Sequence, residues 1–203
     1  MKTTRLFFVI AIIAMIIGET ACKGTGSKNT SSEDSTKVDT LWNAKVQDTF
    51  FDTKFGASKE EVIKNFAKHG FRLDKEYSEK DFLVFYHTPK NRFEFGGLIW
   101  EGVQVFFTNK KFSAIRFFTP TKDKPTAISD FNSISEVISQ KYRLTKIEPK
   151  DTLTYAVKRA YCKSGIIAWV TCYRYESFGK EIYFTAELGY HDTNITEKVS
   201  DEL

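Results

Sequence analysis

The sequence contains few of the residues from which most catalytic and metal sites are built. Its 203 residues include only three histidines, three cysteines and four prolines. His69, His87 and His191 lie far apart, and the chain has no HExxH motif, no CxxC pair and no GxSxG nucleophile motif. We therefore expect no metal ion, no cofactor and no catalytic role, and we expect structural or surface roles for the three histidines.

An excess of charge of one sign is also absent. The chain has 30 Lys and Arg residues against 26 Asp and Glu residues, which gives a formal net charge of +4. The basic residues are spread along the sequence, whereas a nucleic-acid-binding protein usually gathers them on one surface. The sequence therefore argues against a nucleic-acid partner. Apolar residues make up 41% of the chain and aromatic residues 15%, which is enough for the core of one globular domain.

The apolar run near the N-terminus is too short to cross a membrane as a helix. Leu6 to Gly18 covers 13 residues, and at ~1.5 Å per residue it reaches roughly 20 Å, short of the ~30 Å hydrocarbon core. It follows two basic residues, Lys2 and Arg5, and is typical of the hydrophobic region of a secretory signal. We predict a signal peptide over residues 1–21.

The residues that follow, Thr20-Ala21-Cys22, resemble the cleavage site of a bacterial lipoprotein precursor of the Bacteroidetes type. Glu19 stands where such sites usually have an aliphatic residue. The resemblance implies that the signal is cut before Cys22, that Cys22 receives lipid, including acyl chains such as palmitate, and that the chain is anchored to a membrane. Each buried CH₂ contributes ~0.8 kcal/mol, and more than one acyl chain gives stable attachment. The alternative is an ordinary signal peptide cleaved near Ala21.

Residues 22–40 begin with this cysteine and continue as a polar segment. Val38 is the one apolar residue among the Gly, Ser, Thr and charged residues of positions 23–40. Such a segment cannot bury enough surface to offset the entropy lost on ordering, so we predict a flexible tether. In some Bacteroidetes lipoproteins, an acidic run just after the lipidated cysteine marks export to the cell surface. No such run follows Cys22, so we expect the protein to face the periplasm.

The C-terminal end points to a different compartment. Residues 193–203 are a polar tail ending in Ser-Asp-Glu-Leu, which resembles the K/H-D-E-L signal that retains proteins in the endoplasmic reticulum. Asn29 and Asn194 each begin a glycosylation sequon. A protein of the endoplasmic reticulum lumen is therefore an alternative to the bacterial lipoprotein.

Residues 41–192 have the pattern of an α+β domain. Ser58-Lys59-Glu60-Glu61 is a capping box, an apolar stripe follows it at helical spacing, and Gly70 ends the predicted helix. A strand over 46–55 is expected before this helix. A second helix is expected over about 126–142, after a connector at Pro120 to Pro125.

Three strand-like runs follow each predicted helix. We therefore predict an antiparallel sheet built from two αβββ repeats, with halves at about 46–119 and 120–190. The six runs are residues 81–88, 97–108, 112–119, 152–162, 166–175 and 181–190.

This order of elements resembles the tandem-repeat folds of the beta-lactamase-inhibitor-protein-like group and of small envelope lipoproteins of the SmpA type. The segment Phe55-Gly56-Ala57-Ser58-Lys59-Glu60-Glu61-Val62 resembles the opening of such a repeat, where a Gly and a capped helix follow a strand. The resemblance covers roughly residues 46–190. It implies that both helices pack on one face of the sheet and that the domain binds a partner, and it assigns no catalytic residue.

Two cysteines remain once Cys22 is assigned to lipid. An oxidising compartment would allow Cys162 and Cys172 to pair. In a tight hairpin, however, they would lie several residues of rise apart, and disulfide Cα atoms must lie within about 7 Å. We expect two free, buried thiols.

The strand over 166–175 carries the candidate binding residues. Along this strand an apolar set of residues alternates with a more polar and aromatic set. The apolar set, which is apolar enough to pack beneath the helices, consists of Ile166, Ala168, Val170 and Cys172. The other set would place Trp169, Tyr173 and Tyr175 on the open face of the sheet, beside Tyr183. Tyr and Trp on such a face are typical of partner-binding surfaces. The alternatives are that the connector or the tails cover these rings, or that the two faces are reversed.

Together these patterns favour a lipid-anchored envelope protein whose domain is a non-catalytic binding module for a protein or an envelope polymer. An envelope hydrolase with its site at a sheet edge is the alternative among enzymes. The sequence does not identify the partner.

Overall fold

The computed structural model describes residues 46–88, 90, 92–162, 164–177 and 179–195. The predicted signal peptide, Cys22, the tether and residues 196–203 lie outside the described residues. Within the described part, no helix is long and apolar enough to cross a membrane. In chain order the elements are β1 (Thr49–Phe50), β2 (Thr53–Lys54), α2 (Lys59–Lys68), β3 (Phe71–Asp74), β4 (Phe82–His87), β5 (Phe93–Phe95), β6 (Leu98–Trp100), β7 (Gly102–Thr108), β8 (Lys111–Thr121), α3 (Lys124–Ser139), β9 (Thr145–Ile147), β10 (Thr154–Tyr161), β11 (Ile166–Glu176) and β12 (Ile182–Asp192).

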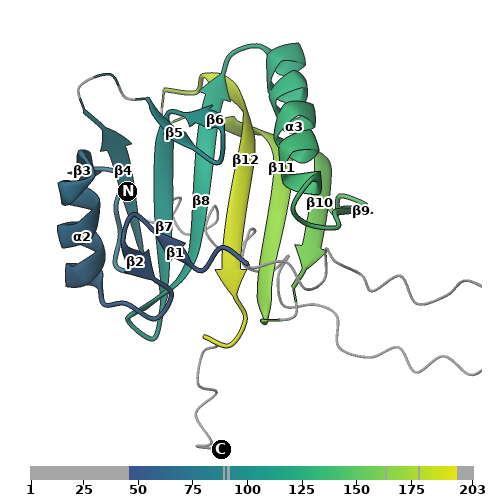
Figure 1. Cartoon of the computed structure of the whole chain (residues 1–203). Helices are drawn as coiled ribbons and strands as arrows, with labels where there is room; N and C mark the ends of the chain where they lie inside the picture. Colours follow the sequence, from purple (N-terminus) through teal and green to yellow (C-terminus); the bar gives the residue numbers. More distant parts are fainter. Residues whose placement is uncertain (1–45, 89, 91, 163, 178, 196–203) are drawn as a thin grey trace, which may run out of the picture. The chain divides into compact units, whose positions relative to one another are not determined.

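Eight of these strands form one sheet, in the order β3-β4-β7-β8-β12-β11-β10-β9 (Figure 1). Every neighbouring pair is antiparallel. The α+β class and the antiparallel sheet are therefore as the sequence predicts. The strands differ from the prediction in two ways. The run predicted as one strand over 97–108 is divided between β6, in a separate two-stranded sheet, and β7, in the main sheet. In addition, four strands of the main sheet follow each helix instead of three. The two additional strands, β3 and β9, have only four and three residues and lie at the two edges of the sheet.

Both helices pack on the same face of this sheet. The strand register aligns Phe85, Val103, Phe117, Leu188 and Val170 in one transverse row, so their side chains share a face. The α2 residue Phe66 contacts Phe85, with ring centroids 4.8 Å apart. On α3, the ring of Phe131 lies 5.3 Å from the ammonium of Lys158, which is paired in register with Val170.

Local signals determine where the helices begin and end. The Ser58 hydroxyl accepts a hydrogen bond from the Glu61 amide (3.2 Å), and Gly70 follows the last turn of α2 with a φ of 81°. Asp123 caps α3 by accepting from the Thr126 amide (2.9 Å). The second helix therefore begins two residues earlier than predicted and ends at Ser139. The expected connector is corrected too, because Pro120 and Thr121 belong to strand β8.

Two small hairpins fill the helix-bearing face alongside the helices. The strand predicted over 46–55 is instead β1 and β2, joined by a turn in which Phe51 and Asp52 both have positive φ (48° and 59°). That turn places the Phe51 ring 4.6 Å from the ring of Phe71. In the β5–β6 hairpin, Phe95 stacks on Phe117 at 4.3 Å. Aromatic burial under the hairpins thus offsets the strain of a left-handed turn at a bulky residue.

Both cysteines within the described residues are free thiols, as expected. Cys172 is fully buried on the helix-bearing face of β11, and its register partner is Ala156. Cys162 lies at the β10–β11 turn and is only partly buried, so the expectation that both thiols are buried is wrong for Cys162. Burial raises the pKa of the Cys172 thiol to about 11.

Candidate binding face

The face of the sheet opposite the helices is called the helix-free face below. Side chains alternate along a strand, so Trp169, Tyr173 and Tyr175 on β11 point to this face while Cys172 and Val170 point to the helices. Tyr183 is paired in register with Tyr175, so it lies on the same face. The structure therefore places all four predicted residues together on the face that carries no helix.

The three tyrosines form a continuous group near one end of β11 and β12. The rings of Tyr175 and Tyr183 stack at 5.7 Å, and those of Tyr173 and Tyr175 lie 6.2 Å apart. The group ends in an exposed polar cluster, where Glu181 accepts from the Tyr183 hydroxyl (2.8 Å) and from the ammonium of Lys122 (3.0 Å). The tyrosine rings are half-buried, which leaves part of each ring available to a partner.

Two glycines allow aromatic rings to lie close against the backbone on this face. A Cβ added at Gly189 would meet three bonded atoms of the Trp169 indole at 2.0, 2.2 and 2.5 Å. Such similar distances mean that the Cβ would meet the face of the ring, so the indole lies flat over β12. The tip of the Phe118 ring lies over Gly102 in the same way, with its nearest atom 2.2 Å from the Cβ position. Without a side chain at these two positions, the rings can cover the strands beside them.

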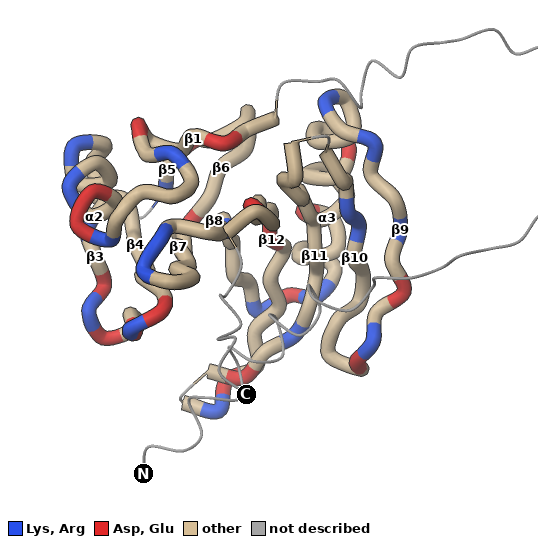
Figure 2. Tube along the Cα trace, turned by 90° about the horizontal axis from the view of Figure 1, so that it is seen from below, with Lys and Arg blue, Asp and Glu red and all other residues tan. Residues whose placement is uncertain are grey.

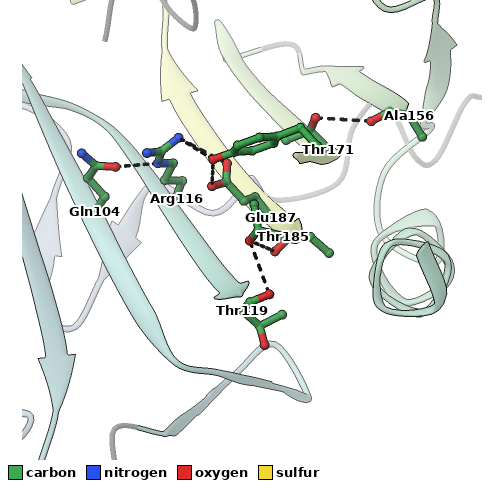
Figure 3. A network of polar contacts seen from close by, with 9 residues as sticks. Gln104, Arg116, Thr119, Ala156, Thr171, Thr185 and Glu187 are labelled. Atoms are coloured by element: carbon green, nitrogen blue, oxygen red, sulfur yellow. Dashed lines mark hydrogen bonds and ion pairs between the residues drawn. The ribbon is translucent and has the colours of Figure 1, made fainter. Parts of the chain in front are cut away.

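A charged pair lies at the centre of the helix-free face. In Figure 3, Arg116 of β8 lies between Gln104 of β7 and Glu187 of β12. The Arg116 Nε donates to Gln104 Oε1 (2.7 Å), and Nη1 lies 3.4 Å from Glu187 Oε2. The Tyr173 hydroxyl donates to Glu187 Oε1 (2.6 Å) and accepts from Arg116 Nη1 (3.4 Å). Both oxygens of the carboxylate are therefore engaged by neighbouring side chains.

Burial controls the electrostatics of this cluster. The Glu187 side chain is only 3% exposed and that of Arg116 only 15%. Removal from water raises the pKa of Glu187 above its usual value, and Arg116 opposes this shift. Burial, with the neighbouring carboxylate, also raises the pKa of Tyr173 well above its usual value. The guanidinium lies in addition over the ring of Phe106, 5.4 Å from its centroid.

Charge is otherwise scarce along the central strands. Figure 2 shows many of the Lys, Arg, Asp and Glu residues on α2, in loops and toward the ends of strands. Strand β7 has none, and away from their first and last residues β8 and β12 carry only Arg116 and Glu187. Burying a charged side chain costs free energy unless an opposite charge lies beside it. Their pairing makes this point of the face ordered and polar.

The histidines are dispersed, as expected. His69 pairs with Asp52 (2.7 Å) at the end of α2, and His87 contacts Phe71. His191 lies on the helix-free face, and its Nδ1 is buried without a partner among the described residues. Burial lowers the pKa of His191. In the described ranges, no three His, Cys, Asp or Glu side chains are grouped in a way that could hold a metal ion.

Sequence reasoning missed the central pair. Arg116 and Glu187 lie 71 residues apart in the chain, and only the pairing of β8 with β12 brings them together. The sequence nevertheless contains a pattern that could have indicated the pair. Apart from the terminal residues of β8 and β12, Arg116 and Glu187 are each the one charged residue of their strand. A charge at such a position predicts a partner on a neighbouring strand.

Comparison of the chain with protein families, with curated proteins and with solved structures gives no match. Functional assignment therefore depends on the chemistry of the residues. The helix-free face combines half-buried rings with one ordered ion pair, and this combination is suited to binding.

Proposed function

We propose that the protein is a membrane-anchored lipoprotein of a bacterial envelope, and that its domain binds an envelope protein or polymer without catalysis. Cys22 would carry the lipid, and the polar segment to residue 40 would let the domain reach its partner from the membrane. The protein would face the periplasm. The resemblance to Bacteroidetes lipoproteins at Thr20-Ala21-Cys22 supports this part of the proposal.

The observation that carries the binding role is the helix-free face itself. Trp169, Tyr173, Tyr175 and Tyr183 lie on this face, and the Tyr173 hydroxyl is hydrogen-bonded to the buried Arg–Glu pair. Aromatic and arginine side chains dominate the energetics of most binding surfaces. The ion pair and the tyrosine hydroxyl fix the central side chains before binding, which lowers the entropy lost on association.

We also propose that the two halves of the domain are structural repeats. Each helix precedes four strands of the main sheet, and the last strands of the two halves, β8 and β12, pair at its centre. This arrangement supports the likeness to the beta-lactamase-inhibitor-protein-like and SmpA-type folds. In such a repeat the helix-free face would run continuously across both halves.

The alternative is a protein of the endoplasmic reticulum lumen, and it is based on the resemblance of Ser-Asp-Glu-Leu to a retention signal. One of its two sequons is at Asn194, whose side-chain nitrogen donates to Ser164 O (3.1 Å) and to Asp192 Oδ1 (2.8 Å). A glycan would replace one of these hydrogens, and a Cβ at Gly165 would already touch this amide. These contacts leave little room for a glycan on Asn194, and they therefore favour the hypothesis of a bacterial lipoprotein over that of a lumenal protein.

The anchor is tested by the intact mass of the protein extracted from membranes. We expect the mass of residues 22–203 plus a diacylglyceryl group and an acyl chain, and we expect a Cys22→Ser variant to lose this addition. A glycosylated mass, or an unmodified chain that begins near residue 22, would contradict the anchor.

The binding face is tested by photo-crosslinking in cells that produce the full chain. A photoreactive residue at Tyr175 should give a defined adduct, whereas one at Ile128, exposed on α3, should not. Replacing both Trp169 and Tyr173 with Ala should abolish the Tyr175 adduct while the domain stays folded. An unchanged adduct, or no adduct from Tyr175, would contradict the proposed face. A hydrolase would instead turn over substrates in a broad screen.

A further inference from the structure

His191, near the end of β12, lies on the helix-free face with a buried ring nitrogen that has no hydrogen-bond partner among the described residues. An unperturbed histidine changes charge between about pH 5 and pH 8, where no other unperturbed side chain does. On the basis of the binding function proposed above, we propose that His191 is a pH sensor of the helix-free face. Protonation of its imidazole at mildly acidic pH opens the end of β12 beside Trp169 and weakens the binding of the partner.

The buried nitrogen of His191 has no acceptor for a ring hydrogen. In the neutral imidazole one nitrogen carries a hydrogen and the other does not, whereas both carry one in the imidazolium. In the charged ring Nδ1 must therefore be a donor, and the described part of the chain provides no group to accept from it. A buried, unpaired charge costs free energy, and burial accordingly lowers the pKa of His191. The folded domain thus favours the neutral ring.

The residues that flank His191 on the neighbouring strands carry no negative charge. β12 lies between β8 and β11 (Figure 1), and His191 is paired in register with Ala114 on β8 and with Ile167 on β11. Neither of these side chains can be charged. Arg116, two residues from Ala114 on the same face of β8, is positive and does not stabilise an imidazolium.

Two carboxylates lie on β12 itself. Asp192 opposes the lowering of the His191 pKa, but its Oδ1 already accepts from the backbone nitrogen and the side-chain nitrogen of Asn194 (2.9 and 2.8 Å). Glu187 is on the same face as His191 but four residues away, and it is paired with Arg116. Burial is therefore the larger influence on the His191 pKa and Asp192 the smaller one.

His191 occupies the last position at which β12 is paired on both sides. The pairing of β8 with β12 ends at Ala114 and His191, whereas the pairing of β11 with β12 continues to Ile166 and Asp192. A strand end that is held on one side can open locally after few hydrogen bonds are broken. A free-energy penalty at His191 therefore acts on a part of the sheet that can open without unfolding of the whole domain.

The same part of the sheet supports the Trp169 indole. The ring lies over Gly189, two residues before His191 on the same face. Trp169 itself follows Ile167, the register partner of His191, by two residues on β11. Separation of Ile167 from His191 thus removes the pair of residues next to the indole and its glycine. The protonation of His191 is in this way connected to one of the rings of the binding face.

The pH range of the sensor follows from the direction of the pKa shift. The pKa of His191 has its ordinary value of 6.5 in an opened or unfolded chain and a lower value in the folded domain. The open state therefore binds the proton more tightly, and the closed state has its full stability above about pH 7.5. As the pH falls below 6.5, the equilibrium constant for opening rises by up to about tenfold per pH unit until the folded-state pKa is reached.

Two measurements on the full chain in mild detergent test the sensor. In an NMR titration of the wild-type protein, the ring protons of His191 should titrate with a midpoint below 6.5. Urea unfolding at about pH 7.5 and pH 5 compares wild type with His191→Phe, and we expect the ratio of their unfolding equilibrium constants to rise at least about threefold at the lower pH. A midpoint at or above 6.5, or an unchanged ratio, would overturn the inference.

Two further variants control for the substitution itself. His191→Gln supplies the same comparison with a neutral polar side chain, and it replaces His191→Phe if the larger ring prevents folding. His69→Gln is the matched control, because His69 lies at the end of α2 and pairs with Asp52 at 2.7 Å. It should retain the loss of stability at acidic pH, and a loss that depended on His69 instead of His191 would count against the sensor.

Hydrogen exchange measured by mass spectrometry tests whether the opening is local. After correction for the intrinsic exchange rates, peptides that cover residues 189–192 should exchange at least about threefold faster at about pH 5 than at pH 7.5. Peptides that cover residues 182–186, at the other end of β12, should not, and His191→Phe should remove the difference. The same acceleration at both ends of the strand would contradict a local opening.

Crosslinking in cells separates this inference from the binding function itself. The photoreactive residue at Tyr175 should give about threefold less adduct in medium of about pH 5.5 than at pH 7.5, because only the closed face binds, and His191→Phe should remove this difference. An equal yield at both pH values in the wild-type chain would overturn the sensor while the binding face stands. No adduct at either pH would contradict the binding face, and the sensor with it.

Discussion

Replacing Arg116 with Leu is expected to destabilise the domain in a way that depends on pH. The substitution removes the hydrogen bond to Gln104 and leaves Glu187, 3% exposed, without its cation. Removing one partner of a buried ion pair costs about 3–5 kcal/mol. Arg116 is itself 15% exposed and its contact with Glu187 is long at 3.4 Å, so we expect the lower end, about 3 kcal/mol at pH 7.

The pH dependence follows from the protonation of Glu187. Burial already raises its folded-state pKa above the ordinary 4.5, and loss of Arg116 raises it further. The folded variant therefore binds this proton more tightly than the unfolded chain, and the penalty grows as pH rises through the folded-state pKa. Well below pH 4.5 the carboxyl is neutral in both states. The remaining loss is then about 1 kcal/mol, from the missing hydrogen bond to Gln104.

Urea unfolding at pH 7 and at pH 3.5, followed by circular dichroism, measures this difference. Arg92→Leu is the control, since Arg92 forms an exposed pair with Glu101 at 3.7 Å and should cost less than about 1 kcal/mol at either pH. Replacing Arg116 and Glu187 together with Leu should recover much of the loss at pH 7, because no unpaired charge remains. The same loss for Arg116→Leu at both pH values would refute the assignment of a buried, paired Glu187.

Three further predictions concern single positions. Gly189→Ala should lower the unfolding free energy by about 1–3 kcal/mol in chemical denaturation, because the new Cβ displaces the Trp169 indole; an unchanged stability would mean that the indole does not lie over β12. Ser58→Ala should cost about 1 kcal/mol by removing the cap of α2, and Ser58→Gly only a few tenths. The Cys172 thiol should react with Ellman's reagent only after denaturation, since it is fully buried and its pKa is raised to about 11; rapid labelling of the native protein would contradict its position.

The parts of the fold that sequence reasoning predicted are those set by neighbours in the chain. The capping box at Ser58 and the left-handed Gly70 define α2 within one residue, because caps act over three or four positions. The alternation in 166–175 assigned each side chain to its face of β11, because strand periodicity is local. Strands β3 and β9 were missed, since three or four residues at a sheet edge carry too short a pattern.

The central ion pair shows what local patterns cannot supply. Whether Arg116 meets Glu187 depends on which strands pair and in which register, and a shift of one residue would move either side chain to the helix-bearing face. The turn at Phe51 likewise depends on contacts between residues that are distant in the chain. A bulky residue with positive φ is disfavoured locally, and it is stabilised here by contacts with rings that lie 15 or more residues away in the chain, including Phe66 and Phe71.

The central side chains of the helix-free face are held in place by contacts within the domain, and this property would favour the binding role proposed for the face. An arginine on an ordinary surface samples many rotamers, and ordering such a side chain on binding costs about 0.5–1.5 kcal/mol. Arg116 is already held by Gln104, Tyr173 and Glu187. The Trp169 indole is likewise fixed over Gly189. A ligand that contacts these groups therefore retains most of the interaction energy it gains, even where the contact area is small.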